Sequence, residues 1–153
     1  MMRICSIASG SSGNCVYVGS DTTHLLMDAG ISGKRTETGL WELGIRMQDI
    51  DGIFLTHEHA DHISGLGVLA RKYGVPVYGT KGTLGAVRAS HSLGTIDEEL
   101  FHCVQADEKV PVKDVTLYPI RPSHDAAEPV AYRISHDSKK IGLLTDVGCY
   151  NDD

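Results

Sequence analysis

Residues 57–62 place three histidines, a glutamate and an aspartate within six positions, directly after an apolar run, in the string THEHADH that starts at Thr56. Imidazole and carboxylate groups are the ligands that zinc and related divalent cations commonly take in proteins. A lone histidine is more often structural than a metal ligand, but a cluster this dense is not explained so simply. The string therefore predicts a metal-binding site.

An apolar strand over residues 52–56 is expected to position this cluster. Alternate side chains of an extended segment share one face, so His57, His59 and Asp61 are predicted to point the same way at the end of the strand. His62 is predicted to begin the next helix and to face elsewhere, beside Asp61, where it could serve a neighbouring ion. The layout predicts two ions.

One other metal motif can be excluded from the spacing. His57 and Glu58 begin like the H-E-x-x-H motif of zinc proteases, but that motif requires a histidine four residues after the first, on a helix. This chain has Asp61 at that position, and the residues before His57 indicate a strand.

The composition is that of one soluble globular domain. The chain has 153 residues, of which 41% are hydrophobic and 22% charged, so it is neither disordered nor membrane-spanning. Its net charge of −6 is unfavourable for wholesale attraction to a polyanion but leaves a local basic groove open. No C-x-x-C pair and no signal peptide are present, so we predict a cytoplasmic protein with reduced, non-ligating cysteines at positions 5, 15, 103 and 149.

Strand and helix patterns alternate along the chain and predict a mixed α+β fold. Residues 3–8, 15–19 and 25–28 are expected to form an antiparallel meander. A helix capped by Ser32 should follow, with Leu40, Trp41 and Leu43 as its buried stripe and Gly44 just after its end. Further strands are expected over 52–56, 75–78, 101–104, 115–120, 129–134 and 140–145, and further helices over 62–73 and from a Thr80 cap to Ala89.

The THEHADH string resembles the H-x-H-x-D-H motif of the metallo-β-lactamase superfamily. Three other marks of that family appear in order: Asp28 at the end of an early strand, His124 within residues 122–126, and Asp146 within residues 144–148. Residues 8–14, 30–34 and 124–130 are similar to its YycJ/WalJ-like branch. The resemblance implies an αβ/βα sandwich, and we expect residues 1–153 to be one such domain, C-terminally incomplete, with the first half and the start of the second.

The same resemblance implies a ligand set for two ions. His57, His59 and His124 would hold the first ion, and Asp61 and His62 the second. Asp146 would bridge the two ions. The family's last histidine ligand would lie beyond residue 153, so the second site would lack one ligand. Zinc is the expected metal, with manganese as the alternative.

Two carboxylates are assigned further roles by the resemblance. Asp28 would lie behind the ligands and accept a hydrogen bond from a ligand histidine, which fixes the tautomer of that ring. Asp61 would also act in catalysis by orienting the nucleophile. Two divalent ions close together can share a hydroxide and hold the oxygens of a phosphate.

Three functions remain open from the sequence. The branch-specific segments favour a dinuclear phosphodiesterase, with DNA as substrate and exonuclease-like cleavage by a metal-bound hydroxide. The alternatives are a small-molecule hydrolase acting on a thioester, lactone or amide, and an inactive metal-binding fragment. For the isolated chain we expect one firmly held ion and weak or no hydrolysis. We also expect a broad apolar sheet face that is exposed or covered by self-association.

Residues 9–14 form a glycine- and serine-rich loop with two interpretations. Its backbone N–H groups and hydroxyls could cradle an anion, with Ser11, Ser12 and Asn14 as substrate contacts and Lys34 as a further one. The loop could equally be a tight hairpin connection, because glycine and serine are common in turns.

Overall fold

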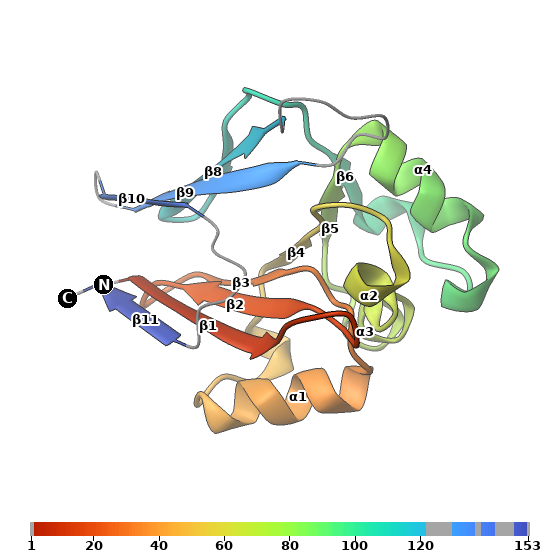
Figure 1. Cartoon of the computed structure of the whole chain (residues 1–153), viewed down its shortest axis with the longest axis horizontal. Helices are drawn as coiled ribbons and strands as arrows, with labels where there is room; N and C mark the ends of the chain where they lie inside the picture. Colours follow the sequence, from red (N-terminus) through yellow and green to blue (C-terminus); the bar gives the residue numbers. More distant parts are fainter. Residues whose placement is uncertain (1, 122–129, 137–138, 143–148, 153) are drawn as a thin grey trace.

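Two β-sheets packed face to face, with helices on the outer side of the larger one, make up the fold (Figure 1). The computed structural model describes residues 2–121, 130–136, 139–142 and 149–152. The larger sheet has the strand order β11-β1-β2-β3-β4-β5-β6, and the smaller has the order β10-β9-β8-β7. The strands are β1 (Met2–Ala8), β2 (Cys15–Gly19), β3 (His24–Met27), β4 (Gly52–Phe54), β5 (Val77–Gly79), β6 (Phe101–Cys103), β7 (Val110–Val112), β8 (Val115–Ile120), β9 (Ala131–His136), β10 (Lys139–Gly142) and β11 (Cys149–Asp152).

The described part of the chain has four α-helices, which lie between the strands of its first part. They are α1 (Gly33–Glu42), α2 (Ala60–Ile63), α3 (Leu66–Tyr73) and α4 (Lys81–Ala89). Short 3-10 turns cover Met47–Asp49, His91–Leu93 and Glu98–Leu100. The predicted helix over residues 62–73 is therefore two helices, separated at Ser64 and Gly65.

The direction of the strands decides where a site can form. Strands β1, β2 and β3 pair antiparallel, as the predicted meander requires, whereas β3, β4, β5 and β6 run parallel to one another. The carboxyl ends of these four strands therefore lie at one edge of the sheet. In open α/β sheets, this edge is where ligands bind.

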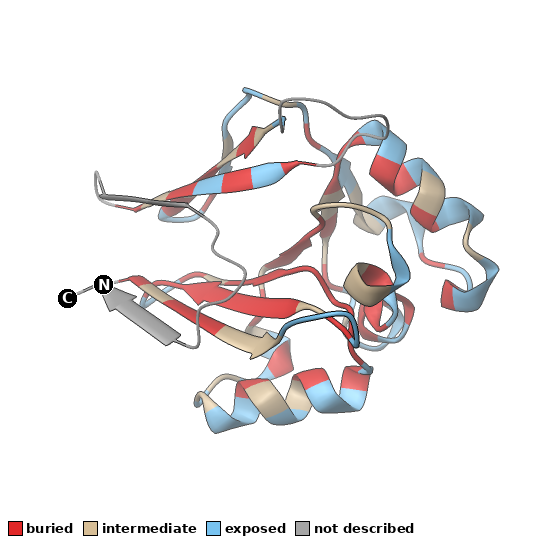
Figure 2. Cartoon of the chain, in the orientation of Figure 1, coloured by how far each residue is buried: buried red, intermediate tan, exposed pale blue. Residues whose placement is uncertain are grey.

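Both faces of the larger sheet are buried, and each face has its own core. Leu26 and Ile53 belong to the cluster that packs against Leu40 of α1 and Leu69 of α3. The opposite face packs against the smaller sheet in a second cluster, which includes Leu25, Met27, Phe54, Leu117, Tyr132 and Ile134. Strands β2 and β3, which lie between the two cores, are therefore buried along almost their whole length (Figure 2). Helix α1, in contrast, is buried only on its sheet-facing side.

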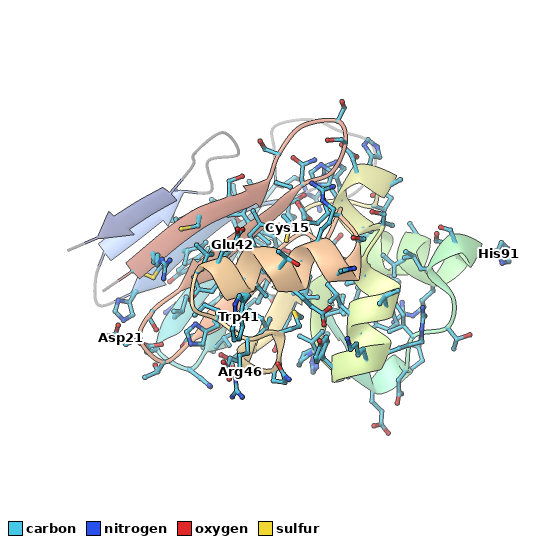
Figure 3. The ribbon with its side chains drawn as sticks, turned by 90° about the horizontal axis from the view of Figure 1, so that it is seen from below. Cys15, Asp21, Trp41, Glu42, Arg46 and His91 are labelled. Carbon is cyan, nitrogen blue, oxygen red and sulfur yellow. The ribbon has the colours of Figure 1, made fainter. Side chains whose placement is uncertain are left out.

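Helix α1 begins as predicted, but one residue of its predicted buried stripe is exposed. The Ser32 hydroxyl accepts a hydrogen bond from the Arg35 N–H at 3.2 Å, and Gly44 adopts a left-handed φ of 82° after the helix. Trp41, however, is 72% exposed, as its place in Figure 3 illustrates. Consecutive residues lie about 100° apart around a helix, so fully buried Leu40 takes the sheet-facing position and Trp41 cannot. The prediction that Trp41 is a core residue was wrong.

The smaller sheet also corrects the expected surface. Among the described residues, Trp41 and Val68 are the large hydrophobic side chains that are exposed, so the broad apolar face expected for self-association is not found there. The reason is that β7, which periodicity did not reveal, pairs with β8 and helps to cover the inner face of the larger sheet.

A polar cluster joins the two sheets at the turn between β7 and β8. The Asp114 carboxylate accepts hydrogen bonds from Ser20 Oγ at 2.8 and 2.9 Å and from the Thr23 hydroxyl. The Nε2 atom of His136 lies 3.0 Å from the same carboxylate. Ser20 and Thr23 lie just before β3, so this cluster marks the end of β3 opposite to the parallel strands' carboxyl edge.

The cysteines differ from one another in state. Cys15 and Cys103 are free thiols, and burial raises the pKa of Cys15 to about 12. Cys5, which lies opposite Cys149 in the β1–β11 ladder, is disulfide-bonded. The prediction of reduced cysteines was therefore wrong for Cys5. None of the helices in the described part of the chain has the length and apolarity needed to cross a bilayer.

Candidate metal centre

The metal loop, defined here as residues 56–62, follows β4 at the carboxyl edge of the parallel strands. Helix α2 already begins at Ala60, with His59 as its extended N-cap residue. The predicted alternation therefore holds only for His57 and His59, and Asp61 lies in the first turn of α2. Its carboxylate is in a favourable position there, because the N-terminal end of a helix favours negative charge.

The three histidines of the metal loop lie against one another. The ring centroids of His57 and His59 are 4.6 Å apart, and those of His57 and His62 are 3.8 Å apart. Oδ2 of Asp61 lies 3.8 Å from Nε2 of His62. The expectation that His62 faces away from the other two rings was wrong, because the helix turns immediately after His59 and carries His62 back over His57.

Asp28 lies behind these rings, where it ties β3 to the metal loop. It is 4% exposed and has a φ of 66°, a left-handed conformation that is uncommon for residues other than glycine. Its Oδ2 lies 2.7 Å from Nδ1 of His62, and its Oδ1 accepts the Thr56 N–H at 2.8 Å. Strain of this kind concentrates at functional sites, where the surrounding contacts hold it in place.

Thr56 is a contributor that the sequence interpretation did not assign. Its hydroxyl donates to Asp28 Oδ2 at 2.7 Å and lies 3.0 Å from Nδ1 of His57. Thr56 thus links the buried carboxylate to two of the loop's imidazoles. The signal that could have revealed it is its position, immediately before the first histidine of the cluster.

The pKa values of His57 and His62 are shifted in opposite directions. Burial lowers the pKa of His57, and the nearby His62 lowers it further, so this ring is neutral at physiological pH with a lone pair available to a cation. Burial also opposes a charge on His62, but the hydrogen bond that its ring donates to Asp28 and the charges of Asp28 and Asp61 outweigh it and raise the pKa of His62. The difference reflects the direct contact that only His62 makes with a carboxylate.

The side chains of the metal loop suit a divalent metal, but the described residues do not form a complete ligand set. Imidazoles backed by a carboxylate are the arrangement found around zinc. Within residues 2–121 and the described parts beyond them, however, no three His, Cys, Asp or Glu side chains already converge as a complete site. The remaining predicted ligands, His124 and Asp146, lie outside the described residues.

Two contacts anchor the smaller sheet to the metal loop. The Val130 N–H donates to the Thr56 carbonyl at 2.9 Å, and the buried Tyr132 hydroxyl donates to the Leu55 carbonyl at 2.8 Å. Val130 is the sixth residue after His124. Six residues after the predicted ligand His124, the chain is therefore hydrogen-bonded to Thr56, the first residue of the metal loop.

The predicted substrate-contact residues separate into two groups. Ser11, Ser12 and Lys34 are exposed. Asn14 instead points toward the metal loop, where its Nδ2 lies 3.3 Å from both Asp61 Oδ2 and His62 Nε2. The structure therefore brings Asn14, and not the two serines, into contact with the predicted ligands.

A cavity of about 510 Å³ lies beside the metal loop along the same sheet edge. Its lining includes Thr80, which follows β5, Val104, which follows β6, and Val130, which bonds to Thr56. Two basic side chains, Lys81 and Arg121, and one acidic side chain, Asp107, also line it. This cavity has basic side chains within a chain of net charge −6.

The four histidines outside the metal loop that matched no motif lie elsewhere. His24 Nδ1 is 2.6 Å from the Tyr17 hydroxyl, His102 stacks on Tyr78, and His136 contacts Asp114. Figure 3 shows His91 at the periphery of the molecule, beyond α4. None of these residues joins the metal loop.

Comparison with known proteins gives matches along most of the chain. Residues 8–139 match the family model described as "Metallo-beta-lactamase superfamily". The chain is 42% identical over 146 residues to "Exodeoxyribonuclease YycJ" of Bacillus anthracis and to "Exodeoxyribonuclease WalJ" of Streptococcus pneumoniae. Each match covers 95% of this chain but 54% of the relative, so the chain spans about half the length of these proteins.

Solved structures agree on the fold. The metallo-beta-lactamase fold protein YhfI from Bacillus subtilis aligns with a TM-score of 0.71 and 20% identity, covering 92% of this chain and 60% of that one. A B3 metallo-beta-lactamase with an active-site glutamic acid aligns with a TM-score of 0.73 and 14% identity, covering 88% and 56%. The αβ/βα sandwich predicted from the sequence, with its first half and the start of the second, is confirmed.

Proposed function

This chain belongs to the metallo-beta-lactamase superfamily, and from that premise we propose that it is a metal-dependent phosphodiesterase of the DNA exonuclease type. The observation that carries the proposal is the metal loop itself. Three imidazoles and Asp61 lie together at the carboxyl edge of the parallel strands, with buried Asp28 bonded to one of the rings. The similarity to two exodeoxyribonucleases supports DNA as the substrate class.

We assign the ligands of two divalent ions as the family pattern suggests. His57, His59 and His124 would hold one ion, and the second would be held by Asp61, His62 and Asp146. Zinc fits the imidazoles, and manganese is the alternative because of the carboxylates. When bound, the ions supply a nucleophilic water of lowered pKa and neutralise the charge that develops on the phosphate.

The chain's own residues prepare this site. The Asp28 carboxylate accepts the Nδ1–H of His62 and so leaves Nε2 as the nitrogen with a free lone pair. The lowered pKa of His57 keeps that ring in the neutral form that binds a cation. Asp61, one third exposed at the start of α2, is accessible to solvent and would orient the attacking water.

The cavity beside the metal loop, called the basic cavity after Lys81 and Arg121, offers a route along which the DNA strand could extend from the metal loop. Lys81 and Arg121 line it. Two of its other lining residues, Thr80 and Val104, follow β5 and β6, which lie one and two strands from β4 at about 4.8 Å per strand. Phosphate contacts from lysine and arginine supply most of the sequence-independent affinity for DNA. The cavity would therefore bind the backbone next to the scissile bond, despite the negative net charge of the whole chain.

The proposal is tested by metal analysis combined with a cleavage assay on the 153-residue chain. The substrates are end-labelled duplex DNA, a generic phosphodiester, and a panel of thioester, lactone and amide compounds. We expect bound divalent metal and slow phosphodiester cleavage that stops on chelation and returns with zinc or manganese.

Asp61→Ala is the matched control, because it removes a predicted ligand from a partly exposed position and leaves the core unchanged. Turnover of the lactone or thioester panel without phosphodiester cleavage would identify the small-molecule hydrolase instead. Metal binding with no turnover of any substrate would identify a metal-binding fragment.

A further inference from the structure

Asn14 is the residue through which the glycine- and serine-rich loop touches the metal loop. Its backbone N–H donates to the Asp61 carbonyl at 2.7 Å, and its own carbonyl accepts the Gly30 N–H at 2.8 Å. A Cβ atom on Gly30 would lie 1.8 Å from the Asp61 carbonyl oxygen. The close approach of the two loops therefore requires glycine at position 30.

The orientation of the Asn14 side chain is fixed by one backbone unit. Oδ1 of Asn14 accepts the Gly10 N–H at 3.1 Å, and Nδ2 donates to the Gly10 carbonyl at 3.0 Å. Gly10 has a left-handed φ of 104°, which a side chain would rarely adopt. Because Oδ1 is held by an N–H group, the amide nitrogen is the end that faces the metal loop.

That nitrogen lies between Asp61 and His62, two of the predicted ligands of the second ion. It is 3.3 Å from Asp61 Oδ2 and 3.3 Å from His62 Nε2. On the far side of the ring, Nδ1 of His62 faces the Asp28 carboxylate at 2.7 Å. The Asp28 carboxylate selects the tautomer of His62 with hydrogen on Nδ1. The Asn14 amide nitrogen beside Nε2 offers no acceptor for a hydrogen there, so Nε2 keeps its lone pair.

We propose that Asn14 is a positioning residue, whose amide orients the Asp61 carboxylate and the His62 ring for the second divalent ion. One N–H of the amide donates to the Gly10 carbonyl. The other faces Asp61, whose backbone carbonyl at 3.2 Å and Oδ2 at 3.3 Å both accept, and this leaves Oδ1 of the carboxylate for the cation. The glycine- and serine-rich loop then serves to hold this amide, and substrate contact is not its main role. The inference rests on the metal site of the proposed function.

The test compares two changes at position 14 with a control in the same loop. Asn14→Ala removes the amide, and Asn14→Asp keeps its shape but replaces the donor with a second carboxylate beside Asp61. Ser11→Ala is the control, because Ser11 is exposed in the same loop. The measurements are stepwise zinc affinity by calorimetry and the imidazole ¹H–¹⁵N spectrum of the metal-free protein.

We expect Asn14→Ala to weaken the second ion about 10- to 100-fold, the usual effect of removing a partner of a metal ligand, while the first ion keeps its affinity. The ¹⁵N shifts of His62 should move away from the single tautomer of the unmodified chain. Asn14→Asp should shift them as well, whereas Ser11→Ala should change neither measurement.

Equal loss at both ions, or an unchanged His62 spectrum in Asn14→Ala, would overturn the positioning role. The spectrum also separates this inference from the proposed function. An unmodified chain that binds no zinc would remove the metal site and the inference with it, whereas two bound ions with normal affinities in Asn14→Ala would remove the inference alone.

Discussion

A carboxylate paired with a histidine lies at each end of β3, and the two pairs have different surroundings. Asp28 contacts His62 at 2.7 Å just after the strand, and Asp114 contacts His136 at 3.0 Å beside the residues that precede it. Both carboxylates also accept hydroxyl hydrogen bonds, from Thr56 in one case and from Ser20 and Thr23 in the other. The chain advances five residues from Thr23 to Asp28. At about 3.3 Å per residue, the two ends are about 16 Å apart.

The difference lies in which ring nitrogen contacts the carboxylate and in where each pair stands in the fold. His62 directs Nε2 toward Asp61 and Asn14, next to the rings of His57 and His59. His136 uses Nε2 for Asp114 itself, in the polar cluster between the two sheets. The first pair therefore presents a lone pair to a group of ligands, and the second closes a contact between two sheets.

The comparison teaches that a histidine–carboxylate contact alone does not indicate a metal site. The distances are similar, and both contacts are supported by hydroxyl groups. What distinguishes the Asp28 pair is its location at the carboxyl edge of parallel strands, together with two more histidines on the same short loop.

The largest effect is expected from Asp61→Ala. This change should reduce phosphodiester cleavage by more than the roughly 100-fold that loss of a ligand's outer partner produces, because it removes a ligand itself. The melting temperature should stay close to that of the unmodified chain, since the side chain is one third exposed. The measurement is cleavage of labelled duplex alongside thermal unfolding by circular dichroism.

Asp114→Ala is the opposite case. It should leave cleavage unchanged and lower the free energy of unfolding by about 1–3 kcal/mol, because the hydroxyls of Ser20 and Thr23 lose their acceptor. A large loss of activity in this variant, with the fold retained, would show that the two ends are coupled and that the comparison is wrong.

A smaller effect is expected when the buried carboxylate behind the ligands loses its charge. Asp28→Asn should weaken metal binding about 10- to 100-fold, since the His62 ring loses the partner that sets its tautomer. The same exchange at the other end, Asp114→Asn, should leave metal affinity unchanged. Competition with a chromophoric chelator measures both. Equal affinities in the two variants would remove the distinction between the pairs.

Local sequence patterns predicted much of the fold and the centre of the candidate site. The caps at Ser32 and Thr80 and the meander of β1 to β3 depend on residues close together in sequence, and the structure has them. The cluster from His57 to His62 was recognisable because its ligand residues are consecutive. In each case the information lies within a few positions.

Contacts between distant segments were not predictable in this way. Asn14 meets Asp61 across 47 positions, and no local pattern distinguishes an amide that supports a ligand from one that caps a turn. Trp41 was placed in the core because helical periodicity gives a stripe but not the choice between adjacent residues Leu40 and Trp41. His124 and Asp146 stay predictions, because both lie outside the described residues.

The hydrogen bonds to Asp114 should make the stability of the fold depend on acid. Partial burial raises the pKa of Asp114, but hydrogen bonds from Thr23, Ser20, Thr22 and His136 outweigh it and hold the pKa well below the ordinary 3.8. The folded state then binds a proton less readily than the unfolded state, so this stabilisation is present above about pH 4 and is lost as pH falls toward the folded pKa.

Acid unfolding followed by tryptophan fluorescence tests this dependence. The unmodified chain should lose stability progressively below about pH 4, and Asp114→Asn should show a smaller part of that loss because its side chain does not titrate. The carboxylate is 37% exposed, so the effect is reduced by solvent screening. Identical acid profiles for the two proteins would mean that the hydrogen bonds to Asp114 do not stabilise its charged form.

The smallest effect is expected from two lysines, one at each end of the comparison. Lys81 lines the basic cavity beside the metal loop, whereas Lys113 lies in the Asp114 turn and pairs with Asp51 at 2.9 Å. If DNA follows the cavity, Lys81→Ala should weaken duplex binding a few-fold and reduce by about one the slope of log affinity against log salt, because one phosphate contact is lost. Lys113→Ala should leave both quantities unchanged. Fluorescence anisotropy in a chelating buffer measures binding without cleavage, and an equal response to the two substitutions would mean that the strand does not run along the cavity.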